Sequence, residues 1–128
     1  MAIKTINPSS LGPAIAPYSQ ATVAGNFVFL AGQVALDENN NVIAPGDARA
    51  QAIATLERME TILAEVGGSL QDITTATVWL TDFKHFQAFN EGWAEKFGDH
   101  RPARAALKSE LLIDGLVCEI QAIAVLNA

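Results

Sequence analysis

Charged residues and cysteines are scarce in this sequence of 128 residues. Asp, Glu, Lys and Arg make up 17% of it, and Cys118 is the only cysteine. A single cysteine excludes a disulfide within the chain, and its apolar neighbours favour a buried core residue over a nucleophile. No run approaches the roughly 20 apolar residues of a membrane-spanning helix, and the N-terminus shows no signal peptide. We therefore expect a cytoplasmic protein without a membrane partner.

Basic residues are outnumbered by acidic ones. Eight Lys and Arg face 14 Asp and Glu, which gives a net charge of −6. Nucleic-acid binding depends on neutralising phosphates, so this balance argues against a nucleic-acid partner, although a local basic pocket remains compatible with it. Half of the residues are apolar, which excludes disorder and fits one folded domain, residues 1–128. The low charge also suggests a surface buried against other copies; a compact apolar monomer is the alternative.

Two helices are predicted from apolar spacing and end signals. Asp47 is an N-cap candidate, and Gly67-Gly68 would end the first helix. The second helix should follow the Asp82 region and end at Gly98. The apolar stripes are Ala52, Leu56, Met59, Leu63 and Val66 in the first helix, and Phe86, Phe89, Trp93 and Phe97 in the second. Both stripes are typical of helix faces that pack into a core.

Strands are predicted on either side of these helices. Residues 27–34 and 74–80 are rich in β-branched and aromatic side chains, and 37–41 is a polar turn where a hairpin is plausible. Residues 116–126 are almost wholly apolar on both alternating faces, which indicates a central strand. The order predicts an α+β fold, a mixed β-sheet with two helices packed on one face. Self-association would cover the other face.

Three residues could carry chemistry. Glu119 stands in an apolar strand, where a carboxylate is costly to bury without partners. It is either a base with a tuned pKa, a structural ion-pair partner, or a residue at a strand end facing water. Arg104 follows Pro102 and could present its guanidinium fork to a carboxylate, or be an ordinary surface arginine. Tyr18, the only tyrosine, could hydrogen-bond a substrate or simply pack.

Other candidates are weaker. His85 and His100 lack ligand-like spacing to each other and to Cys118, so no metal site is expected. Ser19 has no evident catalytic partner. Gly32 is an isolated glycine in a predicted strand, which indicates a bulge or a close backbone approach to a ligand.

Taken together, six segments resemble the RidA (YjgF) family over nearly the whole chain. They are Ala16-Pro17-Tyr18-Ser19-Gln20-Ala21, Ala31-Gly32-Gln33, Val78-Trp79-Leu80-Thr81-Asp82 with Phe89-Asn90-Glu91, Pro102-Ala103-Arg104, and Glu119-Ile120-Gln121-Ala122-Ile123-Ala124. The resemblance implies a chorismate-mutase-like α+β fold and a homotrimer with sites between subunits. It also implies hydrolysis of reactive enamines and imines to keto acids and ammonia without a cofactor.

The resemblance also assigns roles. It implies that Arg104 binds the substrate carboxylate, that Glu119 activates water and that Tyr18 hydrogen-bonds in the pocket. The remaining substrate-binding residues that it implies are Asn90, Gly32, Ala31 and the backbone of Ala106. An imine carbon beside a carboxylate is already electrophilic, so orientation and a base suffice.

Several positions depart from the family pattern. Ala31 replaces the usual serine, Ala105 and Ala106 replace small polar or cysteine residues, and Gln121 stands where a second glutamate is frequent. The segments 39–41 and 98–99 resemble branches that act on 3-aminoacrylate or 2-aminomuconate.

These departures leave the substrate open, with several functions to compare. The leading one is a deaminase of 2-aminoacrylate or 2-iminopropanoate type; a different imine is the nearest alternative. The second function is that of a non-enzymatic trimer that binds small carboxylates or has a regulatory role. Ribonuclease activity, against which the net charge argues, and a holdase role complete the set.

Overall fold

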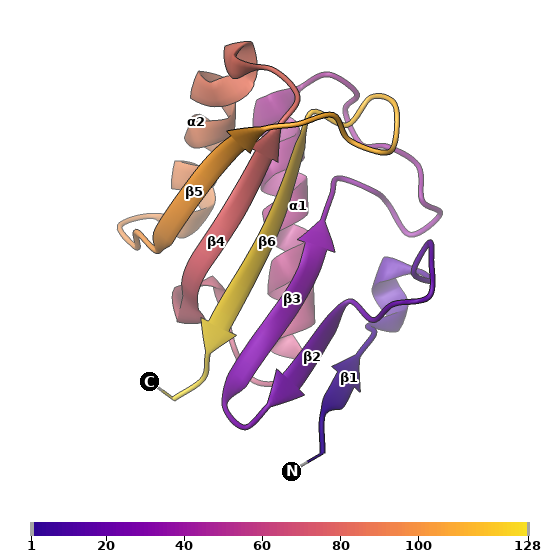
Figure 1. Ribbon diagram of the computed structural model, residues 1–128, viewed down its shortest axis with the longest axis vertical. Helices are drawn as coiled ribbons and strands as arrows, with labels where there is room; N and C mark the ends of the chain where they lie inside the picture. Colours follow the sequence, from indigo (N-terminus) through magenta and orange to yellow (C-terminus); the bar gives the residue numbers. More distant parts are fainter. Residues whose placement is uncertain (1, 128) are drawn as a thin grey trace.

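Six strands form one mixed sheet, and two helices cover one of its faces (Figure 1). The computed structural model describes residues 2–127. The strands are β1 (Lys4–Ile6), β2 (Ala21–Ala24), β3 (Phe27–Gln33), β4 (Ile73–Leu80), β5 (Ala103–Lys108) and β6 (Cys118–Val125), in the order β1-β2-β3-β6-β4-β5. Only β4 and β5 pair in parallel; the other neighbours are antiparallel. The predicted α+β architecture is confirmed.

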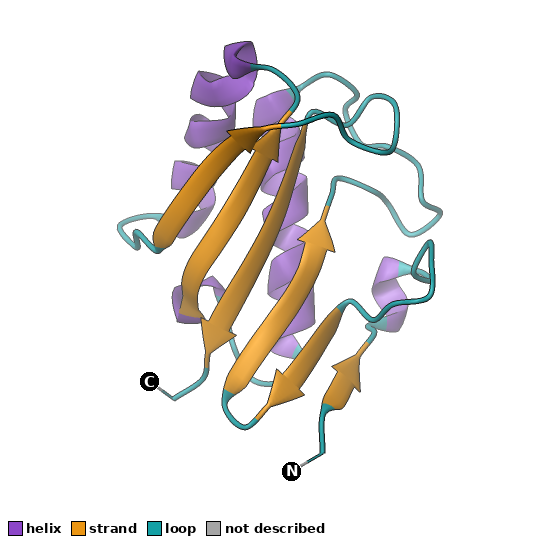
Figure 2. Cartoon of the chain, in the orientation of Figure 1, coloured by secondary structure: helices purple, strands orange, loops and turns teal. Residues whose placement is uncertain are grey.

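The helices are α1 (Ala48–Ala64) and α2 (Phe86–Phe97), and both lie behind the sheet in Figure 2. Three short 3-10 turns accompany them: η1 (Ser9–Leu11), η2 (Leu70–Asp72) and η3 (Phe83–His85). The predicted cap of α1 is confirmed, because the Asp47 carboxylate accepts the backbone N–H of Ala50 at 3.0 Å. The predicted ends are confirmed as well: Gly67 and Gly98 follow the two helices with φ of +75° and +63°.

The core lies between the helices and the sheet. The helices contribute the apolar stripes that the sequence predicted, in which Leu56, Met59 and Phe89 are fully buried. Its sheet side comes largely from alternate residues of β6, namely Cys118, Ile120, Ala122 and Ala124. The prediction that residues 116–126 form a central strand is confirmed, since β6 pairs with β3 on one side and β4 on the other. That another copy of the chain covers the helix-free face of the sheet stays a prediction.

Some elements differ from the expectation. The short strands β1 and β2 were not expected from the sequence. The turn at 37–41 exists, but only Leu36 and Val42 pair across it, because β3 pairs with β2 and β6 instead. The bulge expected at Gly32 is confirmed: the β3–β6 register shifts between Leu30 and Gln33.

Gln51 ties α1 to two loops. Its fully buried side-chain amide donates to the carbonyls of Ile43, Ala44 and Gly115 at 3.2, 3.1 and 2.8 Å. Its carbonyl accepts the backbone N–H of Val117 at 2.8 Å. The carbonyls of Ala44 and Gly115 also accept the backbone N–H groups of Asp47 and Gly46, respectively, whereas Gln51 is the hydrogen-bond partner of the Ile43 carbonyl and the Val117 N–H. The side chain thereby fixes the loop that leads into β6.

We expect Gln51→Leu to destabilise the fold by about 3–5 kcal/mol, because each buried polar group left without a partner costs about 1–3 kcal/mol. Urea unfolding at a fixed protein concentration measures this. The matched control is Gln87→Leu, which makes the same change at an exposed position of α2 and should have little effect. Equal stability of the two variants would show that the Gln51 hydrogen bonds contribute little.

Candidate active site

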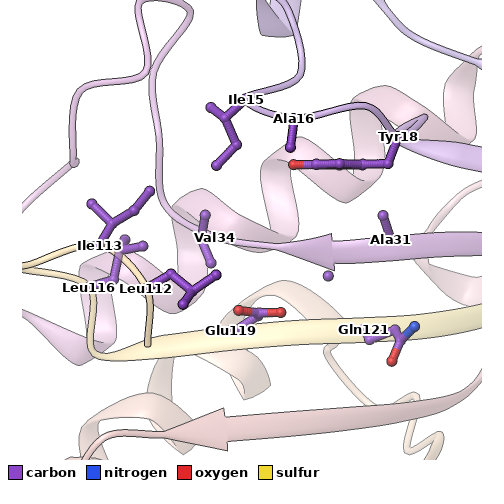
Figure 3. A pocket seen from close by; sticks show the side chains of 11 residues that line it. Ile15, Ala16, Tyr18, Ala31, Val34, Leu112, Ile113, Leu116, Glu119 and Gln121 are labelled. Carbon is purple, nitrogen blue, oxygen red and sulfur yellow. The ribbon is translucent and has the colours of Figure 1, made fainter. Parts of the chain in front are cut away.

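Glu119 lies on the floor of a cavity of about 400 Å³ between β3 and β6 (Figure 3). Gly32 and Ala31 of β3 form one side, and the segment around Tyr18 closes the cavity opposite Glu119. The other lining residues are Ile15, Ala16, Val34, Leu112, Ile113, Leu116 and Gln121. The structure thus brings together four of the residues selected from the sequence: Glu119, Tyr18, Gly32 and Ala31.

The Glu119 carboxylate rests directly on Gly32. A Cβ added at Gly32 would lie 2.2 Å from Oε2 of Glu119, far inside van der Waals contact. The bulge and the absence of a side chain at this position therefore make room for the carboxylate. The predicted close approach at Gly32 exists, and the group that approaches it here is a protein carboxylate.

Glu119 is a carboxylate without a cation partner among the residues that the structure describes. It is half-buried, and none of the ion pairs among residues 2–127 involves it. Burial raises the pKa of its carboxyl group. The alternative of a glutamate paired with a cation is not met within residues 2–127. A half-buried carboxylate with a raised pKa is the form suited to accept a proton from water.

Arg104 is held on two sides. Its guanidinium donates to Oδ1 of Asn90 at 2.9 Å, and its Cζ lies 4.8 Å from the centre of the Trp93 ring. The side chain is half-buried, and burial lowers the pKa of the guanidinium, which nevertheless stays protonated at neutral pH. No carboxylate in the described part of the chain pairs with it. Arg104 is therefore an oriented cation rather than a mobile surface arginine.

Arg104 and Glu119 lie on opposite faces of the sheet. Arg104 is paired with Ala76, a buried residue that faces the helices, whereas Glu119 is paired with Trp79 on the other face. Arg104 borders a separate cavity of about 310 Å³ that shares no lining residue with the Glu119 cavity. One chain therefore does not bring the two groups together on one small molecule.

Asn90 and Ala106 belong to the Arg104 side. Ala106 is paired with Val78, which also faces the helices, and it borders a third cavity of about 160 Å³. Phe83, Phe86 and Leu107 provide most of the wall of this third cavity, with Lys108 at its edge. The expected substrate-binding residues thus divide into two groups within each chain.

A buried polar network supports the Glu119 side and was not expected from the sequence. Arg58 of α1 is only 9% exposed and donates to Oε1 of Gln33 at 3.2 Å and to the Leu36 carbonyl at 3.0 Å. Gln33 in turn donates to Oε1 of Gln20 at 2.9 Å. Burial lowers the pKa of Arg58, and the nearby Tyr18 opposes that shift. The sequence signal that could have indicated this network is the position of Arg58, directly before Met59 of the buried apolar stripe.

The weaker candidates lie elsewhere. Cys118 is fully buried, and burial raises the pKa of its thiol to about 12, as befits the expected core residue. His100 bonds the Ile73 carbonyl at 2.8 Å, and Ser19 meets only Asn7 at 3.4 Å. Across residues 2–127, no cluster of three or more His, Cys, Asp or Glu could hold a metal ion. No helix in this range is long and apolar enough to cross a membrane.

The chain is similar in sequence to known proteins over most of its length. A RutC family protein of Pyrococcus horikoshii is 44% identical over 110 residues, which cover 86% of this chain and 87% of the relative. The 3-aminoacrylate deaminase RutC of Acinetobacter baylyi is 40% identical over 119 residues, which cover 93% and 94% of the two chains.

Solved structures share the fold over nearly the whole chain. RidA from an Antarctic Psychrobacter has a TM-score of 0.88 at 34% identity, with 96% and 99% of the two chains covered. TdcF of Escherichia coli, solved with bound serine, has a TM-score of 0.86 at 32% identity, with 95% and 98% covered. The family model described as endoribonuclease L-PSP matches residues 9–126. The chain belongs to the RidA (YjgF) family, which this model describes.

Proposed function

We propose that this protein hydrolyses imines and enamines derived from amino acids, releasing ammonia and a keto acid. The observation that carries the proposal is Glu119, a half-buried carboxylate with a raised pKa at the floor of an open cavity, with no cation partner in the described part of the chain. A relative named as a deaminase of 3-aminoacrylate, and another solved with bound serine, support a substrate of amino-acid size. The activity is that of a hydrolase acting on C–N bonds.

Glu119 supplies the base in this mechanism. Its carboxylate takes a proton from water as the water oxygen bonds to the carbon of the protonated imine, and a tetrahedral amino alcohol forms. The proton held by Glu119 then passes to the nitrogen. The C–N bond breaks and ammonia leaves as the hydroxyl group gives its proton to the Glu119 carboxylate and becomes the carbonyl. Release of that proton to the solvent regenerates the base. Tyr18, across the cavity, is placed to hydrogen-bond the substrate (Figure 3).

Arg104 binds the substrate carboxylate through its guanidinium fork, with Asn90 fixing the orientation of that fork. Because Arg104 and Glu119 face opposite sides of one sheet, the complete site needs Arg104 from one copy and Glu119 from another. A ring of three copies would build three such sites, each with Ala106 beside Arg104 and Gly32 beside Glu119. The mechanism needs no metal or organic cofactor.

Glu119→Gln should lower kcat/KM for freshly generated 2-aminoacrylate or 2-iminobutanoate by about 10²–10⁴-fold, because the amide cannot accept the proton from water. Ammonia release above the spontaneous rate is the measurement. The exposed Glu110 offers the matched control, Glu110→Gln, which should keep full activity. If wild type binds keto acids tightly but releases no ammonia from any imine, the protein is a carboxylate-binding trimer and the proposal fails.

The pH profile should report the Glu119 carboxyl group. Its deprotonated form is the base, and burial raises its pKa, so kcat/KM should fall with falling pH at a pH above that expected for an exposed glutamate. Rates corrected for spontaneous hydrolysis across the acid range measure this limb. Glu119→Gln should abolish it, and a limb that persists in this variant would assign it to another group.

Two inactive variants should complement each other. Arg104→Ala and Glu119→Gln are each expected to lose activity, but trimers mixed at random should hold about one intact site in four, since each site takes one residue from each of two neighbouring copies. Co-expression with two different tags gives the mixed trimers, and preformed homotrimers combined without exchange are the control. Activity that is never restored in mixed trimers would place both residues in a site within one chain.

A further inference from the structure

Arg58 is a cation in the buried face of α1. It is 9% exposed and directly precedes the fully buried Met59. None of the ion pairs among residues 2–127 involves it, and its guanidinium donates instead to two neutral oxygens, Oε1 of Gln33 and the Leu36 carbonyl. A buried charge without a counter-charge is costly, and well-packed apolar residues of similar volume are often at least as stable. The stability of the core alone therefore does not account for an arginine at this position.

The first wall of the Glu119 cavity that Arg58 reaches is the bulge of β3. The register between β3 and β6 shifts between Leu30 and Gln33, so the regular strand pairing is interrupted at Gly32. The Glu119 carboxylate lies against Gly32 at this interruption. Arg58 holds the next residue, Gln33, through its side chain at 3.2 Å. It therefore fixes the backbone at the place where the carboxylate rests, which the strand pairing does not do by itself.

The second wall is the segment that carries Tyr18 and closes the cavity (Figure 3). This segment, residues 12–20, belongs to no helix or strand, so its position depends on side-chain bonds to the rest of the molecule. One of these bonds lies at its end, where Oε1 of the buried Gln20 accepts the side-chain N–H of Gln33 at 2.9 Å. Since Gln33 is also the partner of Arg58, the same buried cation holds the second wall.

We propose that Arg58 is a positioning residue for the proposed reaction, and that it acts through Gln33 on both walls of the Glu119 cavity. Through Gln33 itself it fixes the backbone beside the catalytic carboxylate. Through Gln20, the next residue in the network, it fixes Tyr18 on the opposite side. The inference rests on the proposed function. Arg58 does not contact the substrate in this scheme; it sets the distance between the base and the group that hydrogen-bonds the substrate.

The test compares the steady-state kinetics of wild type, Arg58→Met and Arg49→Met with freshly generated 2-iminobutanoate. Arg58→Met should lower kcat by about 10–100-fold, because a misplacement of about 1 Å can cost about a hundredfold in rate. KM should change by less than about 3-fold, since Arg104 grips the substrate carboxylate and borders a separate cavity. Arg49→Met makes the same change at an exposed position of α1, where Arg49 pairs with Glu95, and should leave both constants unchanged. Circular dichroism and gel filtration confirm that each variant is folded and assembled.

A second variant tests the network if Arg58→Met does not fold. Gln20→Met cuts the connection to Tyr18 and leaves both bonds of Arg58 in place. It should lower kcat by about 3–10-fold in the wild-type background. In a Tyr18→Phe background the same change should cost at most about 2-fold, because the hydroxyl that it positions is gone, whereas a merely structural loss would multiply in full. Unchanged kcat in either folded variant, or losses that multiply in full, would overturn the positioning role and leave the proposed function intact. No ammonia release by wild type would instead overturn the proposed function.

Discussion

A buried cation held only by neutral oxygens, Arg58, is the interaction on which the Glu119 side of the site depends. Its bonds to Gln33 and to the Leu36 carbonyl compensate the cost of removing a guanidinium from water. The same bonds connect α1 to the strand residue directly after Gly32, and Gln33 passes the connection to Gln20, two residues beyond Tyr18. The β3 segment at Gly32 and the segment around Tyr18, which form two walls of the cavity, are thereby both fixed to α1. The carboxylate of Glu119 can then lie against the bare backbone of Gly32 in a space that the protein itself keeps open.

The arrangement of the sheet places Arg104 and Glu119 on opposite faces. Alternation along β6 turns Glu119 away from the helices, while the parallel pairing of β5 with β4 turns Arg104 toward them. Each chain therefore carries an oriented cation and an unpaired carboxylate that cannot act on one small molecule together. The helix-free face also leaves Phe27 and Phe29 nearly half exposed. Under the proposed function, assembly would bring Arg104 of one copy to Glu119 of another, and a copy packed on the helix-free face would cover those rings. The low charge of the sequence agrees with such a buried surface.

Sequence patterns predicted the elements whose signals are local. Asp47 before an apolar stripe and glycines after it mark α1, and the unbroken apolar character of β6 marks its central place. Glu119 was found because a carboxylate in such a strand is anomalous. The short strands β1 and β2 were missed since three or four residues carry too little periodicity. Arg58 was missed because its partners, Gln33 and Leu36, are distant in sequence, and the division of Arg104 from Glu119 depends on strand register, which propensity does not encode.

The burial of the Cys118 thiol has a consequence under the proposed function. The imine tautomers of such substrates are electrophilic at carbon, and the form of a cysteine that attacks an electrophile is the thiolate. Cys118 is the residue before Glu119, yet its side chain points to the opposite face, is fully buried, and has a pKa of about 12. Practically none of it is ionised at neutral pH, and solvent does not reach it. Under the proposed function, Cys118 therefore presents no thiolate to an electrophilic imine, and turnover proceeds without self-inactivation at this position.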